Sequence, residues 1–236
     1  MMLRWTMRYL LLIALSTGCG TFSYPYEFEP ENFAQDFGSQ TGNLPDGDCT
    51  QAPSLCSTAA SLVSGSTGTC DGATKKCVIT YDFRQVQEID LDKQASFPPQ
   101  VLNSGLVSLV KIDQVRYWTP TNTLSFATPP IDVYFGPKGT QKESDVGAIK
   151  IATLDPLAAA TPTACVMGQP VGDKKSACKM KLTDAGRNAL SVFAKDFKTN
   201  FEALLVAHIV VHSGDAIPAG KLNLSVQPVV AFEITL

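Results

Sequence analysis

Two histidines, His208 and His212, are four residues apart, and that spacing raises the hypothesis of a metal site. On a helix both rings would share one face and bind a single ion. The neighbouring residues Val206, Ile209 and Val210 are β-branched, however, and favour a strand. In a strand the two histidines lie about 13 Å apart, which is too far for one ion. We therefore expect both on the face of a strand, with no metal or cofactor.

A serine hydrolase would place an activated serine beside one of these histidines. The sequence contains no Gly-x-Ser-x-Gly turn, and Gly136-Pro137-Lys138-Gly139 lacks the Gly-Lys-Ser/Thr ending of a phosphate-binding loop. We assign no catalytic residue. A hydrolase remains an alternative, because triads are defined by geometry rather than by order along the chain.

Aromatic side chains at Tyr117, Trp118 and Tyr134 suggest a second kind of chemistry. If they lay exposed on one face of a sheet, their rings would stack against sugars and form a carbohydrate-binding surface. Packing in a core is the commoner fate of such residues. Carbohydrate binding is therefore an alternative to the main interpretation.

Seven cysteines make up the remaining reactive set. Cys49, Cys56, Cys70 and Cys77 follow the pattern C-x6-C-x13-C-x6-C, without the closely spaced pairs of a zinc site. We expect disulfides, which would restrain this loop-rich segment, and three pairings are open. Cys165 and Cys178 flank a polar loop, and a bond between them is the disulfide that we expect first.

The seventh cysteine, Cys19, closes an N-terminal segment with the layout of a secretory signal. Arg4 and Arg8 precede a short apolar run over residues 10–15, which is too short to span a bilayer as a helix. The small residues Ser16, Thr17 and Gly18 follow.

Leu15-Ser16-Thr17-Gly18-Cys19 resembles the lipobox of bacterial lipoproteins, although the leucine stands one residue earlier than usual, with Ser16 in its place. The resemblance covers residues 1–20. It implies cleavage before Cys19, a diacylated thiol and an acylated new amine. Gly20, which is not the aspartate of inner-membrane retention, implies the outer membrane. The alternative is an ordinary signal peptide that leaves Cys19 as a thiol or disulfide partner.

Composition narrows the classes of partner. The chain has 236 residues, of which 44% are hydrophobic and 17% charged, so we expect one folded domain with appendages. Without residues 1–18 it carries 17 basic and 22 acidic groups, a net charge of −5 that disfavours nucleic acid. The expected partners are a membrane, through the lipid, and an envelope protein or polysaccharide.

From residue 78 onward, apolar and polar residues alternate with a period of two, which is typical of antiparallel sheets. Turn residues separate the strand candidates at 79–84, 106–118, 124–127, 131–135, 149–154, 203–212, 222–226 and 231–236. The pattern predicts a mainly β fold, an antiparallel β-sandwich of about seven to eight strands. Thr183 is expected to cap one short helix near residues 184–197, lying across an open end of the sandwich.

The predicted organisation has four parts: a lipoprotein signal peptide (1–18), a lipidated flexible tether (19–48), a Cys-rich segment with a short helix (49–77) and the β-sandwich (78–236). Six aromatics over residues 22–37 are unusual for a linker, so the alternatives are that some pack back on the domain as an added strand or that they meet a partner. We expect an exported, membrane-anchored envelope lipoprotein, a non-catalytic protein-binding or structural module. The alternatives are a carbohydrate-binding module and a lipid-tethered hydrolase of envelope polymers.

Overall fold

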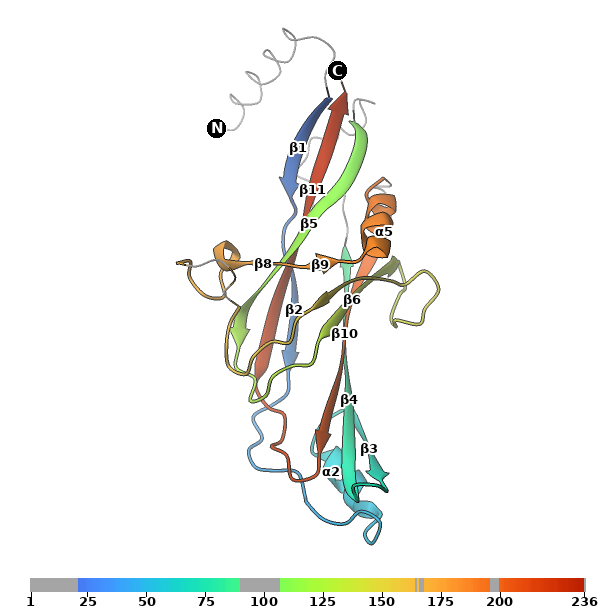
Figure 1. The fold of residues 1–236 in the computed structure, drawn as a ribbon, viewed down its shortest axis with the longest axis vertical. Helices are drawn as coiled ribbons and strands as arrows, with labels where there is room; N and C mark the ends of the chain where they lie inside the picture. Colours follow the sequence, from blue (N-terminus) through green and yellow to red (C-terminus); the bar gives the residue numbers. More distant parts are fainter. Residues whose placement is uncertain (1–20, 90–106, 164, 166–167, 196–199, 236) are drawn as a thin grey trace.

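The fold was obtained as a computed structural model, which describes residues 21–89, 107–163, 165, 168–195 and 200–235. Two antiparallel sheets pack face to face in an elongated molecule (Figure 1). In chain order the elements are β1 (Thr21–Glu27), β2 (Glu31–Asp36), α2 (Ser54–Ser61), β3 (Ser66–Asp71), β4 (Lys76–Ile89), β5 (Val107–Asn122), β6 (Ile131–Pro137), β7 (Ile149–Leu154), η1 (Lys174–Ser176), β8 (Cys178–Lys179), β9 (Lys181–Leu182), α5 (Asp184–Lys195), β10 (Phe201–His212) and β11 (Lys221–Thr235).

The predicted β-sandwich is confirmed, but with more strands than expected. One sheet has five strands, in the order β1-β11-β5-β8 with β2 also on β11, and the other has six, in the order β3-β4-β10-β6-β7-β9. Among the predicted strands, residues 124–127 form a bend instead. The extra strands include β8 and β9. Each has two residues, which is too few to show an alternation of apolar and polar residues.

The flexible tether predicted over residues 19–48 is wrong where the structure describes it. β1 pairs with the C-terminal half of β11, and β2 pairs with its N-terminal half. Phe28, Phe33 and Leu44 are buried at 4% exposure or less. The segment is therefore part of the sandwich, as the added-strand alternative proposes, because β11 supplies its hydrogen bonds from almost two hundred residues further along the chain.

The main core lies between the two sheets and follows the period-two alternation. Along β10, Phe201, Ala203 and Leu205 point into it and are almost fully buried. A smaller core lies beneath α2, between that helix and the ends of β3 and β4. Tyr81 and Val211 pack against both cores and join them.

The predicted helix is confirmed as α5, with Thr183 as its cap: the Thr183 Oγ1 accepts the backbone N–H of Gly186 at 2.8 Å. A Cβ on Gly186 would lie 2.4 Å from the Ile151 carbonyl oxygen, so glycine permits the helix to approach β7. The helix contacts β5 in one sheet and β7 in the other and therefore covers an open end of the sandwich, as predicted.

Residues 44–77 form a compact unit, called the tip below, at the end of the molecule opposite to the start of β1 (Figure 1). Two disulfides hold it, Cys49–Cys70 and Cys56–Cys77, and a third joins Cys165 to Cys178. The expected Cys165–Cys178 bond is thus confirmed, and one of the three open pairings of the other four is selected. Cys19 lies outside the described residues.

Candidate functional site

The two histidines lie on β10, as the β-branched neighbours predict, and each is exposed beside a carboxylate. The Nδ1 atom of His208 is 2.7 Å from an Asp82 oxygen on β4, and that of His212 is 3.6 Å from an Asp215 oxygen. In an extended strand they are about 13 Å apart. Within the described residues, the ring nitrogens contact carboxylates and no serine hydroxyl, so this arrangement provides no activated nucleophile.

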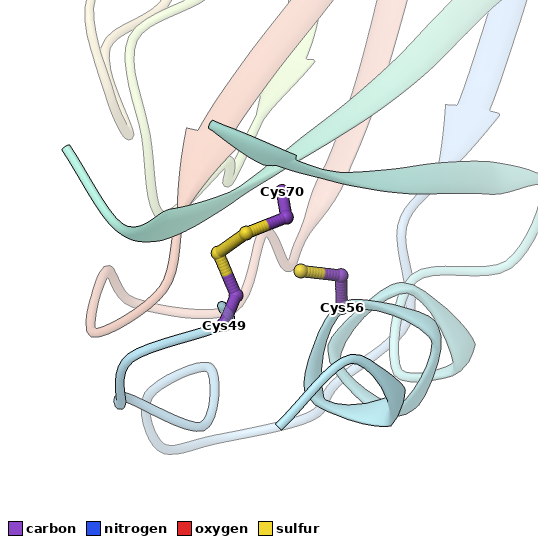
Figure 2. Close-up of side chains that lie close together, drawn as sticks. All are labelled: Cys49, Cys56 and Cys70. Atoms are coloured by element: carbon purple, nitrogen blue, oxygen red, sulfur yellow. A yellow bond between two sulfur atoms is a disulfide. The ribbon is translucent and has the colours of Figure 1, made fainter. Parts of the chain in front are cut away.

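A single group of three side chains in the described part of the chain brings metal-capable atoms within 4.8 Å of one another: Cys49, Cys56 and Cys70 (Figure 2). Cys49 is bonded to Cys70 and Cys56 is bonded to Cys77. A metal ligand must be a thiolate, and these sulfurs are oxidised. These cysteines therefore belong to two disulfides. Cys49–Cys70 fastens the loop before α2 to β3, and Cys56–Cys77 fastens α2 to β4.

A charge cluster around Arg84 lies on the outer face of the six-stranded sheet. Arg84 on β4 donates to both carboxylate oxygens of Glu143, from Nε at 3.1 Å and from Nη2 at 2.9 Å. Its Nη1 also donates to Asp82 at 3.2 Å. Glu143 belongs to the loop between β6 and β7, so the bidentate pair clamps that loop to the sheet.

This clamp changes the acidity of its carboxylates. The Arg84 guanidinium lowers the pKa of Glu143 from 4.5 to about 2, because its hydrogen bonds favour the charged form. The pKa of Asp82 is also lowered, first by its contact with His208 and then by Arg84. A carboxylate held in its charged form by an arginine is a poor general acid at neutral pH. The cluster is suited to holding a loop in place.

The three aromatics proposed for sugar stacking do not share a surface. Tyr117 points into the main core and is 8% exposed, and burial raises the pKa of its hydroxyl. Trp118, the next residue on β5, has its side chain on the opposite face and is 6% exposed. Tyr134 belongs to the other sheet, on β6 between the core residues Val133 and Phe135. These three residues therefore do not form the stacking surface that the sequence offered as an alternative.

A different aromatic group comes together where the tip meets the sandwich. Phe37, Tyr81 and Phe126 are half-buried, and Phe37 contacts both others edge-on, at centroid distances of 5.5 Å and 5.3 Å. They come from three distant segments, and no spacing in the sequence connects them. Sequence reasoning missed this cluster for that reason.

A hollow of about 770 Å³ lies beside this joint, on the outside of three connecting segments. One wall comes from the segment after β2, another from the segment before β11, and the third from the segment after β5. Its lining is dominated by small polar and apolar residues, with Asp36 and Lys221 as its charged members. Its size would admit a small ligand.

Comparisons with known proteins add little. No family model and no curated protein sequence matches the chain. Solved structures match it with low similarity. A structure of Desmodium yellow mottle tymovirus has 6% identity and a TM-score of 0.29, and the match covers 94% of this chain and 91% of that chain. A structure of a semi-empty virus-like particle of the prawn Macrobrachium rosenbergii nodavirus has 12% identity and a TM-score of 0.31, and the match covers 94% of this chain and 97% of that chain. Likeness at this level carries no conclusion about function or assembly.

A spanning helix needs about 20 apolar residues. None of the helices of the described residues is long and apolar enough to cross a membrane.

Proposed function

We propose that the protein is a bacterial envelope lipoprotein, exported by residues 1–18 and anchored by lipid on Cys19, and that its β-sandwich is a non-catalytic module that docks an envelope protein or organises the envelope. The observation that carries the proposal is the cysteine pairing. Six of the seven cysteines form three disulfides, so that Cys19 has no cysteine left to pair with inside the chain. Disulfides are typical of exported proteins, and lipidation uses the odd thiol.

The position of β1 supports an anchor at this point. Thr21, two residues after Cys19, pairs with Thr235 at one end of the long axis, and the tip lies at the other end (Figure 1). Two residues span at most about 7 Å. A lipid on Cys19 would therefore hold the β1 end of the molecule close to the bilayer, and the tip would project away from it towards partners.

The proposed membrane is the outer one. Gly20 follows the acylated cysteine, and in Gram-negative lipoproteins an aspartate at that place favours inner-membrane retention. Several acyl chains give stable anchoring that a single chain does not, at about 0.8 kcal/mol for each buried CH₂ group.

A non-catalytic role is supported by the way in which the reactive groups are used. His208 and His212 contact carboxylates, and the Glu143 carboxylate is held by Arg84. The described cysteines are in disulfides. A carboxylate on Nδ1 can orient a histidine base, but a hydrolase would also need a nucleophile beside that base, and within the described residues no hydroxyl contacts either ring.

Cell fractionation tests the anchor. The wild type is compared with a form in which residues 1–19 are replaced by a cleavable signal peptide without cysteine, and with Ser23→Ala, an exposed change close to the anchor. We expect the wild type and Ser23→Ala in the outer-membrane fraction after a high-salt wash, and the replaced form in the soluble fraction. A soluble wild type, or a replaced form that sediments equally, would contradict the proposal.

A further inference from the structure

The hollow beside the tip is formed by two segments that run side by side and then separate. The backbone N–H of Gly220 donates to the Gly38 carbonyl at 2.9 Å, and that of Ile217 donates to the Gly42 carbonyl at 3.0 Å. Between these two hydrogen bonds, residues 39–41, called the arch below, make no backbone hydrogen bond to the segment before β11, and they line the hollow. The hollow lies at this separation, so both of its walls are fixed at their ends.

The arch is the polar wall. Ser39, Gln40 and Thr41 are exposed, and none of their side chains or peptide groups forms a hydrogen bond within the described residues. Together they offer two hydroxyls, one amide and three peptide groups. A ligand in the hollow would find these donors and acceptors unoccupied except by water.

The opposite wall is apolar and held rigidly. Ala216 and Ala219 give it its accessible apolar surface, and Ile217 lies beneath them with its side chain buried in the smaller core. The backbone N–H of Ala219 donates to Ser125 Oγ at 3.0 Å, and that of Lys221 donates to Thr123 Oγ1 at 2.9 Å. The wall is thus tied to the segment after β5, which lowers the cost of ordering it around a ligand.

The hollow carries no net charge. Its charged lining residues, Asp36 and Lys221, form an ion pair at 3.0 Å and neutralise each other. The matching ligand is therefore uncharged, with hydrogen-bonding groups on one side and C–H surface on the other. A neutral saccharide has this pattern, because its hydroxyls lie around the ring edge and its ring faces carry C–H groups. The volume of about 770 Å³ lies within the range of small-molecule sites, about 300–1,000 Å³.

We propose that this hollow binds a segment of a neutral oligosaccharide between the 39–41 arch and the Ala216–Ala219 wall. The polar arch would contact the sugar hydroxyls, and the apolar wall would lie against a ring face. The site goes beyond the proposed docking function and does not depend on the lipid anchor, because all of its residues lie between 36 and 221.

Calorimetric titration of the mature full-length protein in detergent tests this site. The probes are four neutral tetrasaccharides (cellotetraose, maltotetraose, mannotetraose and tetra-N-acetylchitotetraose) and one anionic probe, tetragalacturonate. We expect at least one neutral probe to bind and tetragalacturonate not to bind. The absence of binding by all four neutral probes at millimolar concentration, or a preference for the anionic one, would overturn the proposal.

Two variants locate the site. Ser39→Ala/Gln40→Ala/Thr41→Ala removes the polar side chains of the arch, and Ala216→Trp fills the hollow from an exposed position. Each is expected to weaken binding at least tenfold. The control, Ser57→Ala/Ser61→Ala/Ser64→Ala, removes the same number of polar groups from a smaller hollow on the tip and should leave binding unchanged. Binding that survives both site variants would place the sugar elsewhere.

The same titration separates this inference from the proposed function. A form with a cysteine-free signal peptide in place of residues 1–19 has no lipid but keeps the hollow, and it should bind the neutral probe with unchanged affinity. Failure to bind sugar leaves the anchor proposal intact, and a missing anchor leaves the sugar result intact.

Discussion

The side-chain amide of Gln227 donates a hydrogen bond of 2.6 Å to the backbone carbonyl of Phe28. At this place the central strand β11 contains Pro228, which has no N–H, and β1 gives way to β2 on its edge. The Phe28 N–H donates to the Pro228 carbonyl at 3.2 Å, so the ring nitrogen of Pro228 faces Phe28 as well. Gln227 therefore supplies the donor that the proline lacks, and the buried Phe28 carbonyl keeps a partner.

Replacing Gln227 by leucine should remove this hydrogen bond and lower the free energy of unfolding by about 0.5–1.5 kcal/mol. In a Pro228→Ala background the restored N–H can reach the carbonyl, and the same replacement should cost clearly less. Urea denaturation of the four proteins in this cycle measures the difference. Equal costs in both backgrounds would show that the side chain does not substitute for the missing donor.

The two disulfides of the tip close loops of equal length, with a sequence separation of 21 residues in each case. Loop closure therefore predicts the same stabilisation for both, about 3 kcal/mol. Cys56 and Cys77 are buried at 3% and 0% exposure, whereas in the other bridge Cys49 is buried at 1% and Cys70 is exposed. Cys56→Ala/Cys77→Ala should thus destabilise more than Cys49→Ala/Cys70→Ala, by about 1 kcal/mol, because it removes two buried sulfurs instead of one.

Denaturant unfolding of the two double variants, with the remaining disulfides oxidised, provides the comparison. The two variants serve as matched controls for each other, because loop length is the same. A larger loss for the Cys49–Cys70 variant would contradict the importance of the buried bridge.

The Arg84–Glu143 clamp should make stability depend on pH. The pKa of Glu143 is 4.5 in its ordinary state and about 2 in the folded protein, so its contribution is complete above pH 4.5 and is lost as the pH falls towards 2. The side chains are 32% and 27% exposed, and allowing for solvent screening we expect about 1–2 kcal/mol. Glu143→Gln should lose this amount at pH 7 and differ little from the wild type near pH 2.

Urea midpoints of the wild type and Glu143→Gln between pH 7 and pH 2 measure this effect. Glu29→Gln is the control, because Glu29 is exposed and forms no ion pair within the described residues. A constant difference between wild type and Glu143→Gln over the whole range would mean that the glutamine acts through packing and not through charge.

Sorting between membranes offers a fourth prediction, which depends on the lipoprotein proposal. In a Gram-negative host, Gly20→Asp should move the protein from outer-membrane to inner-membrane fractions on a sucrose gradient, while Gly20→Ala should not. A Gly20→Asp protein that stays in the outer-membrane fraction would show that residue 20 does not direct its sorting.

Features with local signals could be predicted from the sequence. β7 occupies Ile149–Leu154, the range expected from its alternation, and α5 begins after Thr183 as the capping pattern indicates. The Cys165–Cys178 bond follows from two cysteines around one loop. In each case, the residues that determine the feature lie within a few turns or strand lengths of one another.

Features that depend on residues far away in the sequence could not be predicted in this way. β1 and β2 have a linker-like composition, and pairing with β11 decides their structure. Tyr134 lies in the other sheet from Tyr117 and Trp118, and that placement depends on which strands pair. The hollow takes its walls from three segments whose residues are unremarkable one at a time.

The central claim of the account is that Cys19 carries the lipid. Intact mass measurement of the native mature protein, followed by sequencing of its N-terminal peptide, tests it most directly. We predict a chain that begins at Cys19 and is heavier than residues 19–236 with three disulfides by the mass of a diacylglyceryl group and an amide-linked acyl chain. A mass that corresponds to a bare thiol or a cystine at Cys19, or a chain that begins elsewhere, would contradict the account.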